Sequence, residues 1–156
     1  MNDDLRSRRE FFDSHTEIPE PRFSCPCCGY PMLFERGGFD ICRICWWEDD
    51  GQDDPNADKV FGGPNHDYSL TDARKNFEAY LVMYPPDRDR RIGGADSEEL
   101  RAIKRDLIEV FSQMLAKPSN EELNELWGKV KRLERNLSRD VKTKIKEFES
   151  KITERE

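Results

Sequence analysis

The sequence predicts an α+β fold: a small cysteine-rich domain closed by a capping helix, followed by a C-terminal antiparallel α-helical hairpin. Three observations predict it. The chain contains two Cys-x-x-Cys pairs, two apolar segments that flank a Gly-Gly turn, and a C-terminal third with apolar residues every three or four positions. Only 35% of the 156 residues are hydrophobic and 38% are charged, so we expect a small core stabilised by a metal or by disulfides.

The cysteine pairs are Cys25/Cys28 and Cys42/Cys45, separated by 13 residues. Two residues within each pair let a tight turn present both thiolates to one ion, which predicts a tetrahedral site for one structural Zn²⁺. A redox dithiol and an iron site are the alternatives, although a redox dithiol needs only one pair, at the start of a helix. A zinc ion held by four cysteines has no open coordination position, so we do not expect it to hydrolyse substrates.

Cys27 lies inside the first turn. Its side chain should point away from the ion when its neighbours face it. We expect a small buried residue, and the alternative is a thiol activated by the metal centre. The four thiolates and one dication sum to −2, so we expect Arg36 or Arg43 to help neutralise the site.

Between the cysteine pairs, apolar segments at 33–34 and 39–41 flank Arg36-Gly37-Gly38, which predicts a β-hairpin and hence a zinc-ribbon-like domain. A loop over 49–66 follows, and a helix over 69–84 closes the domain. The predicted organisation is an N-terminal helix and Pro-containing linker at 1–21, the zinc-binding domain at 22–86, and the helical hairpin at 95–156. The hairpin helices are expected at 97–117 and about 120–153, the first capped by Asp96 and Glu99.

Acidic residues concentrate directly after the second cysteine pair. Residues 46–72 contain eight acidic residues and one basic residue, and the whole chain has a net charge of −7. Such a surface repels phosphates, so we do not expect nucleic acid as a partner and instead expect a protein, with a basic surface as one possibility. The helix at 97–117 covers only half of the longer helix, so self-association through the C-terminal helices is the other possibility.

The segment 48–54 also offers carboxylates for acid–base catalysis, with Glu48, Asp50 and His66 as the candidates. A solvated acidic loop is the simpler interpretation. The loop does not match a calcium-binding EF-hand, which needs Gly at its sixth position and Glu at its twelfth. Of the adjacent Trp46 and Trp47, we expect one to cover the zinc turn. The other is either available to a partner or also part of the core.

Several motifs resemble the bacterial cysteine-rich CPCC family over about residues 22–82. They are Cys-Pro-Cys-Cys-Gly at 25–29, Arg-Gly-Gly-Phe at 36–39, Ile-Cys-x-x-Cys at 41–45, Trp-Glu-Asp-Asp-Gly-Gln at 47–52, Gly-Gly-Pro-Asn at 62–65 and Ser-Leu-Thr-x-Ala-Arg-x-Asn-Phe at 69–77. Some members of that family carry a hydrolase label, which the residues here do not support. The tail at 95–156 lies outside the resemblance.

The sequence thus favours a structural-zinc binding module that mediates protein–protein interaction. One form of it is an acidic inhibitor of the antitoxin or immunity type. A hydrolase that uses acidic residues and His66, and a nucleic-acid-binding zinc ribbon, remain as alternatives. With no apolar stretch of membrane-spanning length and a polar start, we expect a cytoplasmic protein without a membrane span.

Overall fold

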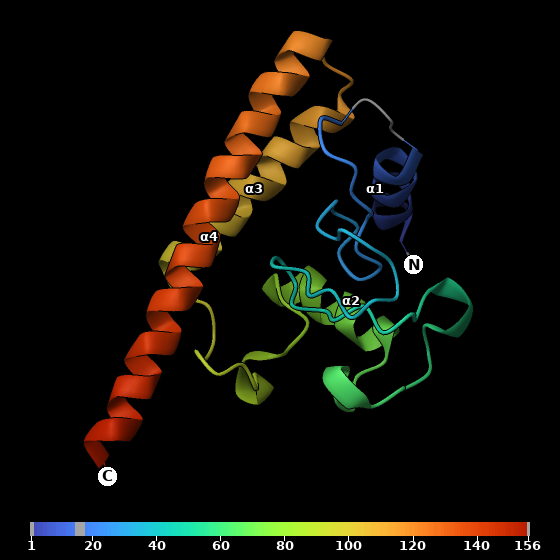
Figure 1. Cartoon of the computed structure of the whole chain (residues 1–156). Coiled ribbons are helices and arrows are strands. Elements are labelled where there is room, and N and C mark those ends of the chain that lie inside the picture. The colour runs from blue at the N-terminus through green and yellow to red at the C-terminus, as the bar shows by residue number, and fades with distance from the viewer. Residues whose placement is uncertain (1, 15–17, 156) are drawn as a thin grey trace.

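The computed structural model describes residues 2–14 and 18–155, so part of the predicted N-terminal linker, residues 15–17, lies outside the described residues. Helices make up nearly all the regular structure (Figure 1). The α-helices are α1 (Asp3–Ser14), α2 (Leu70–Tyr80), α3 (Glu98–Leu115) and α4 (Asn120–Arg155), and single 3₁₀ turns occur at Asp54–Asn56, Gly63–Asn65 and Pro86–Arg88.

The predicted α+β, zinc-ribbon-like fold class is wrong. Within the described ranges the only β pairing consists of two isolated antiparallel bridges, Phe23 with Leu33 and Ile41 with Glu48. Each bridge closes the base of one cysteine turn, so the two apolar segments pair around their own turns and not with each other.

Over residues 33–41, side-chain carboxylates accept from backbone amides that a β-hairpin would have paired with a second strand. The carboxylate of Asp40 accepts from the amide of Phe34 at 2.8 Å, and that of Asp49 accepts from Gly37 at 2.6 Å. These donors are therefore satisfied without a partner strand.

Helix α2 begins with a capping box in which Ser69 and Asp72 bond each other's backbone amides. It ends earlier than residue 84, because Leu81 adopts the left-handed conformation at φ 61°. The chain then turns back so that the amide of Met83 donates to the carbonyl of Cys45 at 2.8 Å. This hydrogen bond fixes the segment after α2 against the second cysteine turn.

The helices α3 and α4 pack against each other in opposite directions, and α4 extends well beyond α3 toward the C-terminus (Figure 1). Ser97 caps α3 by accepting from the amide of Leu100, so the predicted capping role of Asp96 is wrong. Asp96 is instead buried in an ion pair with Lys104, at 2.5 Å.

One hydrophobic cluster joins all parts of the described chain. Phe12 of α1 meets Phe111 of α3 edge-on, with ring centroids 5.7 Å apart, and Tyr30 stacks on the same Phe111 at 5.7 Å. Trp127 of α4 belongs to the same cluster as the cysteines. The division into three segments remains a prediction, and the core runs across its boundaries. In the described part of the chain, no helix combines the length and the apolar character that crossing a bilayer requires.

Candidate metal centre

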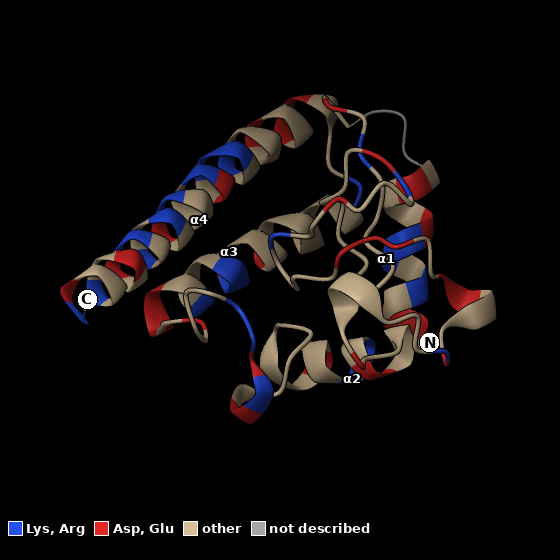
Figure 2. Cartoon of the chain, turned by 60° about the horizontal axis from the view of Figure 1, so that its bottom comes forward, with Lys and Arg blue, Asp and Glu red and all other residues tan. Residues whose placement is uncertain are grey.

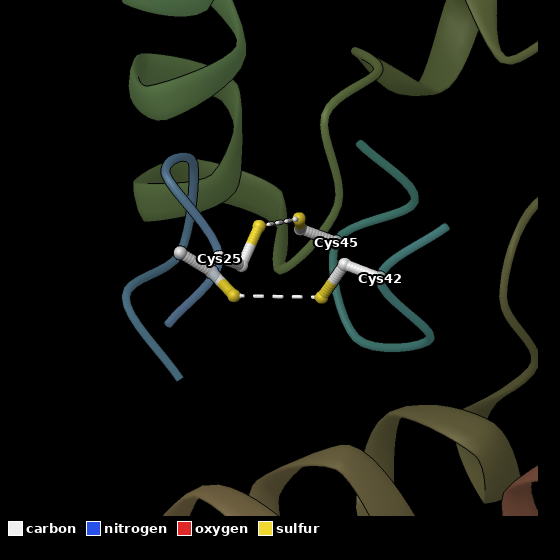
Figure 3. A group of neighbouring side chains, drawn as sticks. Cys25, Cys42 and Cys45 are labelled. Atoms are coloured by element: carbon white, nitrogen blue, oxygen red, sulfur yellow. Dashed lines mark hydrogen bonds between the residues drawn. The ribbon is translucent and has the colours of Figure 1, made fainter. Parts of the chain in front are cut away.

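The structure brings Cys25, Cys28, Cys42 and Cys45 together, with all four sulfurs within 4.8 Å of one another. All four residues are 0% exposed. The sulfurs of Cys25 and Cys45 lie 3.6 Å apart, as do those of Cys28 and Cys42, so each contact joins one turn to the other (Figure 3).

These distances fit a tetrahedral ion. Zn–S bonds of about 2.3 Å place the sulfurs of a regular tetrahedron roughly 3.8 Å apart, close to the observed separations. A disulfide would require a sulfur separation of about 2.0 Å, and all five cysteines of the chain are free. The donor set and its size therefore fit one thiophilic metal ion.

The two turns have the same backbone design. The amide of Gly29 donates to the carbonyl of Cys25 at 2.8 Å, and the amide of Trp46 donates to that of Cys42 at 2.8 Å. Both donors lie in the left-handed region, at φ 81° for Gly29 and φ 68° for Trp46. Gly29 suits that conformation, whereas Trp46 adopts it at an expense of about 1–2 kcal/mol.

Burial controls the charge of the four thiols. Desolvation raises the pKa of Cys25, Cys28 and Cys45. Desolvation also acts to raise the pKa of Cys42, but hydrogen bonds from the other three thiols outweigh it and lower that pKa. Burial thus opposes ionisation of these thiols, and a fully ionised set needs a cation among them.

Two arginines hydrogen-bond to backbone carbonyls of the first cysteine turn. Arg8 of α1 donates to the carbonyl of Cys28 at 2.8 Å, and Arg74 of α2 donates to that of Pro26 at 2.9 Å. Neither contact could be predicted, because nothing in the local sequence of Arg8 or Arg74 marks them as partners of a turn that lies many residues away.

The arginines that we predicted to neutralise the site have other partners. Arg43 pairs with Glu134 and Ser138 of α4, and Arg36 pairs with Asp49 and Asp53. Arg43, inside the second turn, thereby ties that turn to α4.

Cys27 is 1% exposed and belongs to the hydrophobic core. It lies outside the group of four cysteines that could hold a metal ion. Its surroundings match those of a small buried residue.

Three carboxylates of the acidic segment after the metal centre pair with arginines from other parts of the chain. Asp53 pairs with Arg9 of α1 at 2.7 Å and with Arg36 at 2.7 Å, and Asp54 pairs with Arg74 of α2 at 2.7 Å. Desolvation opposes ionisation of Asp53, but hydrogen bonds from the two arginines outweigh it and hold the pKa of that carboxyl far below its usual range. The segment thus joins α1 to α2.

Asp49 is 0% exposed. It accepts from the guanidinium of Arg36 at 3.1 Å, as well as from the amide of Gly37. A carboxylate in this environment serves as an internal acceptor and is not available to a partner.

Buried amides hold the same loop in shape. The side chain of Asn65, 1% exposed, accepts from the amide of Glu48 and donates to its carbonyl, at 3.0 and 2.7 Å. Gln52, 0% exposed, donates to the carbonyls of Asn56 and Lys59. These contacts give two of the motif residues structural roles.

Two of the three candidate acid–base residues contact Asn65, and the third has a different neighbour. The carboxylate of Asp50 accepts from Gln52 and Asn65. The ring of His66 lies 6.3 Å from that of Tyr84, in a tilted arrangement. Asn65 also binds the backbone of Glu48. In the described part of the chain, the side chain of Glu48 has no hydrogen bond or ion pair with Asp50 or His66.

The two tryptophans differ in burial, and neither is fully exposed. Trp47 is 0% exposed in the core next to the cysteines. Trp46 is partly buried, with the guanidinium of Arg91 over its ring at 5.4 Å.

No curated protein and no solved structure matched the chain in the corresponding comparisons. Residues 23–98 match the family model described as "Cysteine-rich CPCC". That segment contains all four cysteines of the candidate centre and the acidic motif, so the match supports membership of the cysteine-rich CPCC family for this part of the chain.

Proposed function

We propose that Cys25, Cys28, Cys42 and Cys45 bind one structural Zn²⁺ ion, and that the protein is a non-enzymatic module that binds another protein chain. The observation that carries the metal assignment is the convergence of four fully buried sulfurs at tetrahedral spacing. Four thiolates in this geometry favour zinc, with iron as the closest competitor. An ion with four protein ligands has no position for a substrate, so its role is to hold the fold.

The contacts around the two turns explain what such an ion would hold. Arg8 attaches α1 to the first turn, Arg74 attaches α2 to it, and Arg43 attaches α4 to the second. Joining the turns therefore joins three helices that come from distant parts of the sequence.

The surface available for a partner is apolar. The end of α4 exposes Phe148 (43%) and Ile152 (45%), beyond the part of the helix that α3 covers. Apolar residues that follow one face of a helix and remain exposed are typical of a protein-binding surface.

An inhibitor of the antitoxin or immunity type would rely on the acidic loop. Three of its carboxylates, on Asp49, Asp53 and Asp54, are already paired with arginines of the same chain. The α4 surface is therefore the stronger basis for binding. On α4, acidic residues interrupt the basic ones (Figure 2), so the helix presents no purely basic surface to nucleic acid.

Metal content of matched cysteine variants tests the zinc site. We expect about one zinc per chain by elemental analysis, and Co²⁺ substitution should give the absorption of tetrahedral sulfur coordination. Cys28→Ala should lose the metal, whereas the control Cys27→Ala, in the same turn, should keep it. Retention of stoichiometric metal by Cys28→Ala, or its absence from the unaltered protein, would reject the assignment.

A further inference from the structure

The C-terminal part of α4 has one continuous apolar face, of which α3 reaches only the first residues, through Leu100. Val141, Ile145, Phe148 and Ile152 follow one another at spacings of four, three and four residues, which places them on the same side of the helix. Val141 and Ile145 are partly buried against the body of the protein, and Phe148 and Ile152 project beyond it.

The near end of this face borders an apolar pocket. Its apolar walls come from Trp46, Ile92, Leu100, Val141 and Ile145, and its volume is about 100 Å³. Because a cavity of about 150 Å³ accommodates benzene, this pocket has room for one aliphatic side chain. Ile92, one of these wall residues, is 63% exposed, so the pocket is continuous with an exposed apolar side chain.

The same helix thus carries an apolar pocket at one end of the face and exposed apolar side chains at the other. Val141 and Ile152 are 11 residues apart, which corresponds to about 16 Å along the helix. Two copies of α4 laid antiparallel would place Ile152 of each copy opposite Val141 of the other, and Phe148 opposite Ile145. Both pockets would then be filled by one two-fold symmetric contact.

We infer that the partner of this surface is a second copy of the chain, bound antiparallel through residues 141–152 of α4. The inference rests on the apolar surface of the proposed function and names its occupant. A parallel pairing would stack the exposed side chains on each other and leave both pockets open, so the positions of pocket and projection select the antiparallel arrangement.

Charges beside the face agree with this arrangement. Lys142 and Glu149 are both exposed and flank the apolar face on the same edge. In the antiparallel pair each Lys142 lies across from Glu149 of the second copy, which gives two attractive contacts. Lys144 and Lys151 on the other edge have like charges, but the ammonium of Lys144 is turned toward its own linker, where it donates to the carbonyl of Ala95 at 2.9 Å.

The interface is small, so the association should be weak. It centres on a few apolar side chains per copy, whereas stable complexes usually bury roughly 1,200 Å² or more. We therefore expect a monomer in dilute solution and a dimer at high protein concentration.

Sedimentation equilibrium of the zinc-loaded full chain over a wide concentration range tests the inference. The unaltered protein should show a reversible monomer–dimer equilibrium. Ile152→Asp should raise the dissociation constant about tenfold or more, because it places a charge in an apolar pocket. The control Ser150→Asp, on the opposite face of the same helix segment, should leave it unchanged. A monomer at every concentration, or a dimer unaffected by Ile152→Asp, would overturn the inference.

Charge reversal tests the direction of pairing. Lys142→Glu and Glu149→Lys should each weaken the dimer several-fold, and the double variant should restore it. In a parallel pair, Glu149 would face Lys144 and not Lys142. An effect of Glu149→Lys without one of Lys142→Glu would thus refute the antiparallel arrangement.

The two proposals can fail separately. Zinc content and helical circular dichroism are measured on the same samples. A zinc-loaded, folded chain that stays monomeric refutes self-association and leaves the zinc assignment in place. A metal-free chain that dimerises as described refutes the zinc assignment and supports the α4 contact.

Discussion

Removing the carboxylate of Glu134 should strongly destabilise the protein, because it leaves a buried arginine without its counter-ion. The guanidinium of Arg22 makes two contacts with Glu134, at 2.8 and 2.9 Å, and the two side chains are 0% and 4% exposed. Breaking a buried ion pair by deleting one partner costs about 3–5 kcal/mol. Arg22 keeps the face of Trp127 at 4.8 Å and a contact with Glu20 at 3.3 Å, so we expect the lower end of that range for Glu134→Leu.

The matched control removes both charges. In the double variant Arg22→Met plus Glu134→Leu, no buried charge of this pair is left unpaired, and its stability should return to within about 1 kcal/mol of the unaltered protein. Arg43, the other partner of Glu134, is 35% exposed and can be hydrated when the carboxylate is lost.

Urea unfolding monitored by circular dichroism, at one fixed concentration of free zinc, gives the free energies of unfolding. Fixed zinc is essential because metal binding adds to the apparent stability. The reasoning would be refuted by a loss below about 1 kcal/mol in Glu134→Leu, or by a double variant that is no more stable than the single one.

Three further predictions concern the metal centre and the acidic motif. Chelation of the metal should melt most of the tertiary structure, seen as loss of the near-UV dichroism of the buried tryptophans and its recovery on adding zinc; an unchanged spectrum would contradict a structural role. Gly29→Ala should destabilise by about 2 kcal/mol in thermal unfolding, because of the positive φ, and because a Cβ at this position would lie 2.7 Å from Leu5 Cδ1. Gly94→Ala, at a similar φ of 78° and with open space around its Cβ, reports the effect of the positive φ alone. Because the pKa of Asp53 is lower in the folded than in the unfolded chain, its carboxylate stabilises the fold at neutral pH, and this contribution is lost as the pH falls below about 4. The difference in unfolding free energy between the unaltered protein and Asp53→Asn, about 1 kcal/mol near pH 7, should therefore shrink on acidification. A difference that stays constant with pH would contradict a stabilising role of the ionised carboxylate.

The helices could be predicted from the sequence because their signals are local. The apolar spacing over 97–117 and 120–153 corresponds to α3 and α4, and Ser69 with Asp72 marks the start of α2. The cysteine pairs could be recognised for the same reason, since each pair lies within one tight turn.

The hairpin prediction rests on two apolar segments around Gly37 and Gly38. It failed because this pattern does not reveal side-chain acceptors that compete with a strand partner for the backbone amides. The carboxylates of Asp40 and Asp49 take the donors that a β ladder would need. A side chain that accepts from the backbone at a distance of several residues removes the need for a strand partner, and periodicity cannot reveal it.

The arginine contacts could not be predicted at all. Arg9 and Asp53 are 44 residues apart and Arg22 and Glu134 are 112 apart, so only the folded chain brings them together. In the sequence these residues are indistinguishable from solvated surface charges. The acidic segment alone therefore suggests either a free surface or a catalytic site.

The acidic motif and the metal centre have the same structural role, which is to join elements that bury little hydrophobic surface. Few apolar residues are available to this chain, so elements without enough hydrophobic surface must be joined by other means. The cysteines could join the two turns through one ion. The carboxylates of Asp53 and Asp54 join α1 to α2 through Arg9 and Arg74. Because ion pairs at partly exposed positions contribute little individually, the network stabilises chiefly where it is buried, at Asp49 and around Glu134. An acidic cluster next to a metal site therefore does not by itself indicate catalysis, because its carboxylates can serve to join helices through arginines, as those of Asp53 and Asp54 do here.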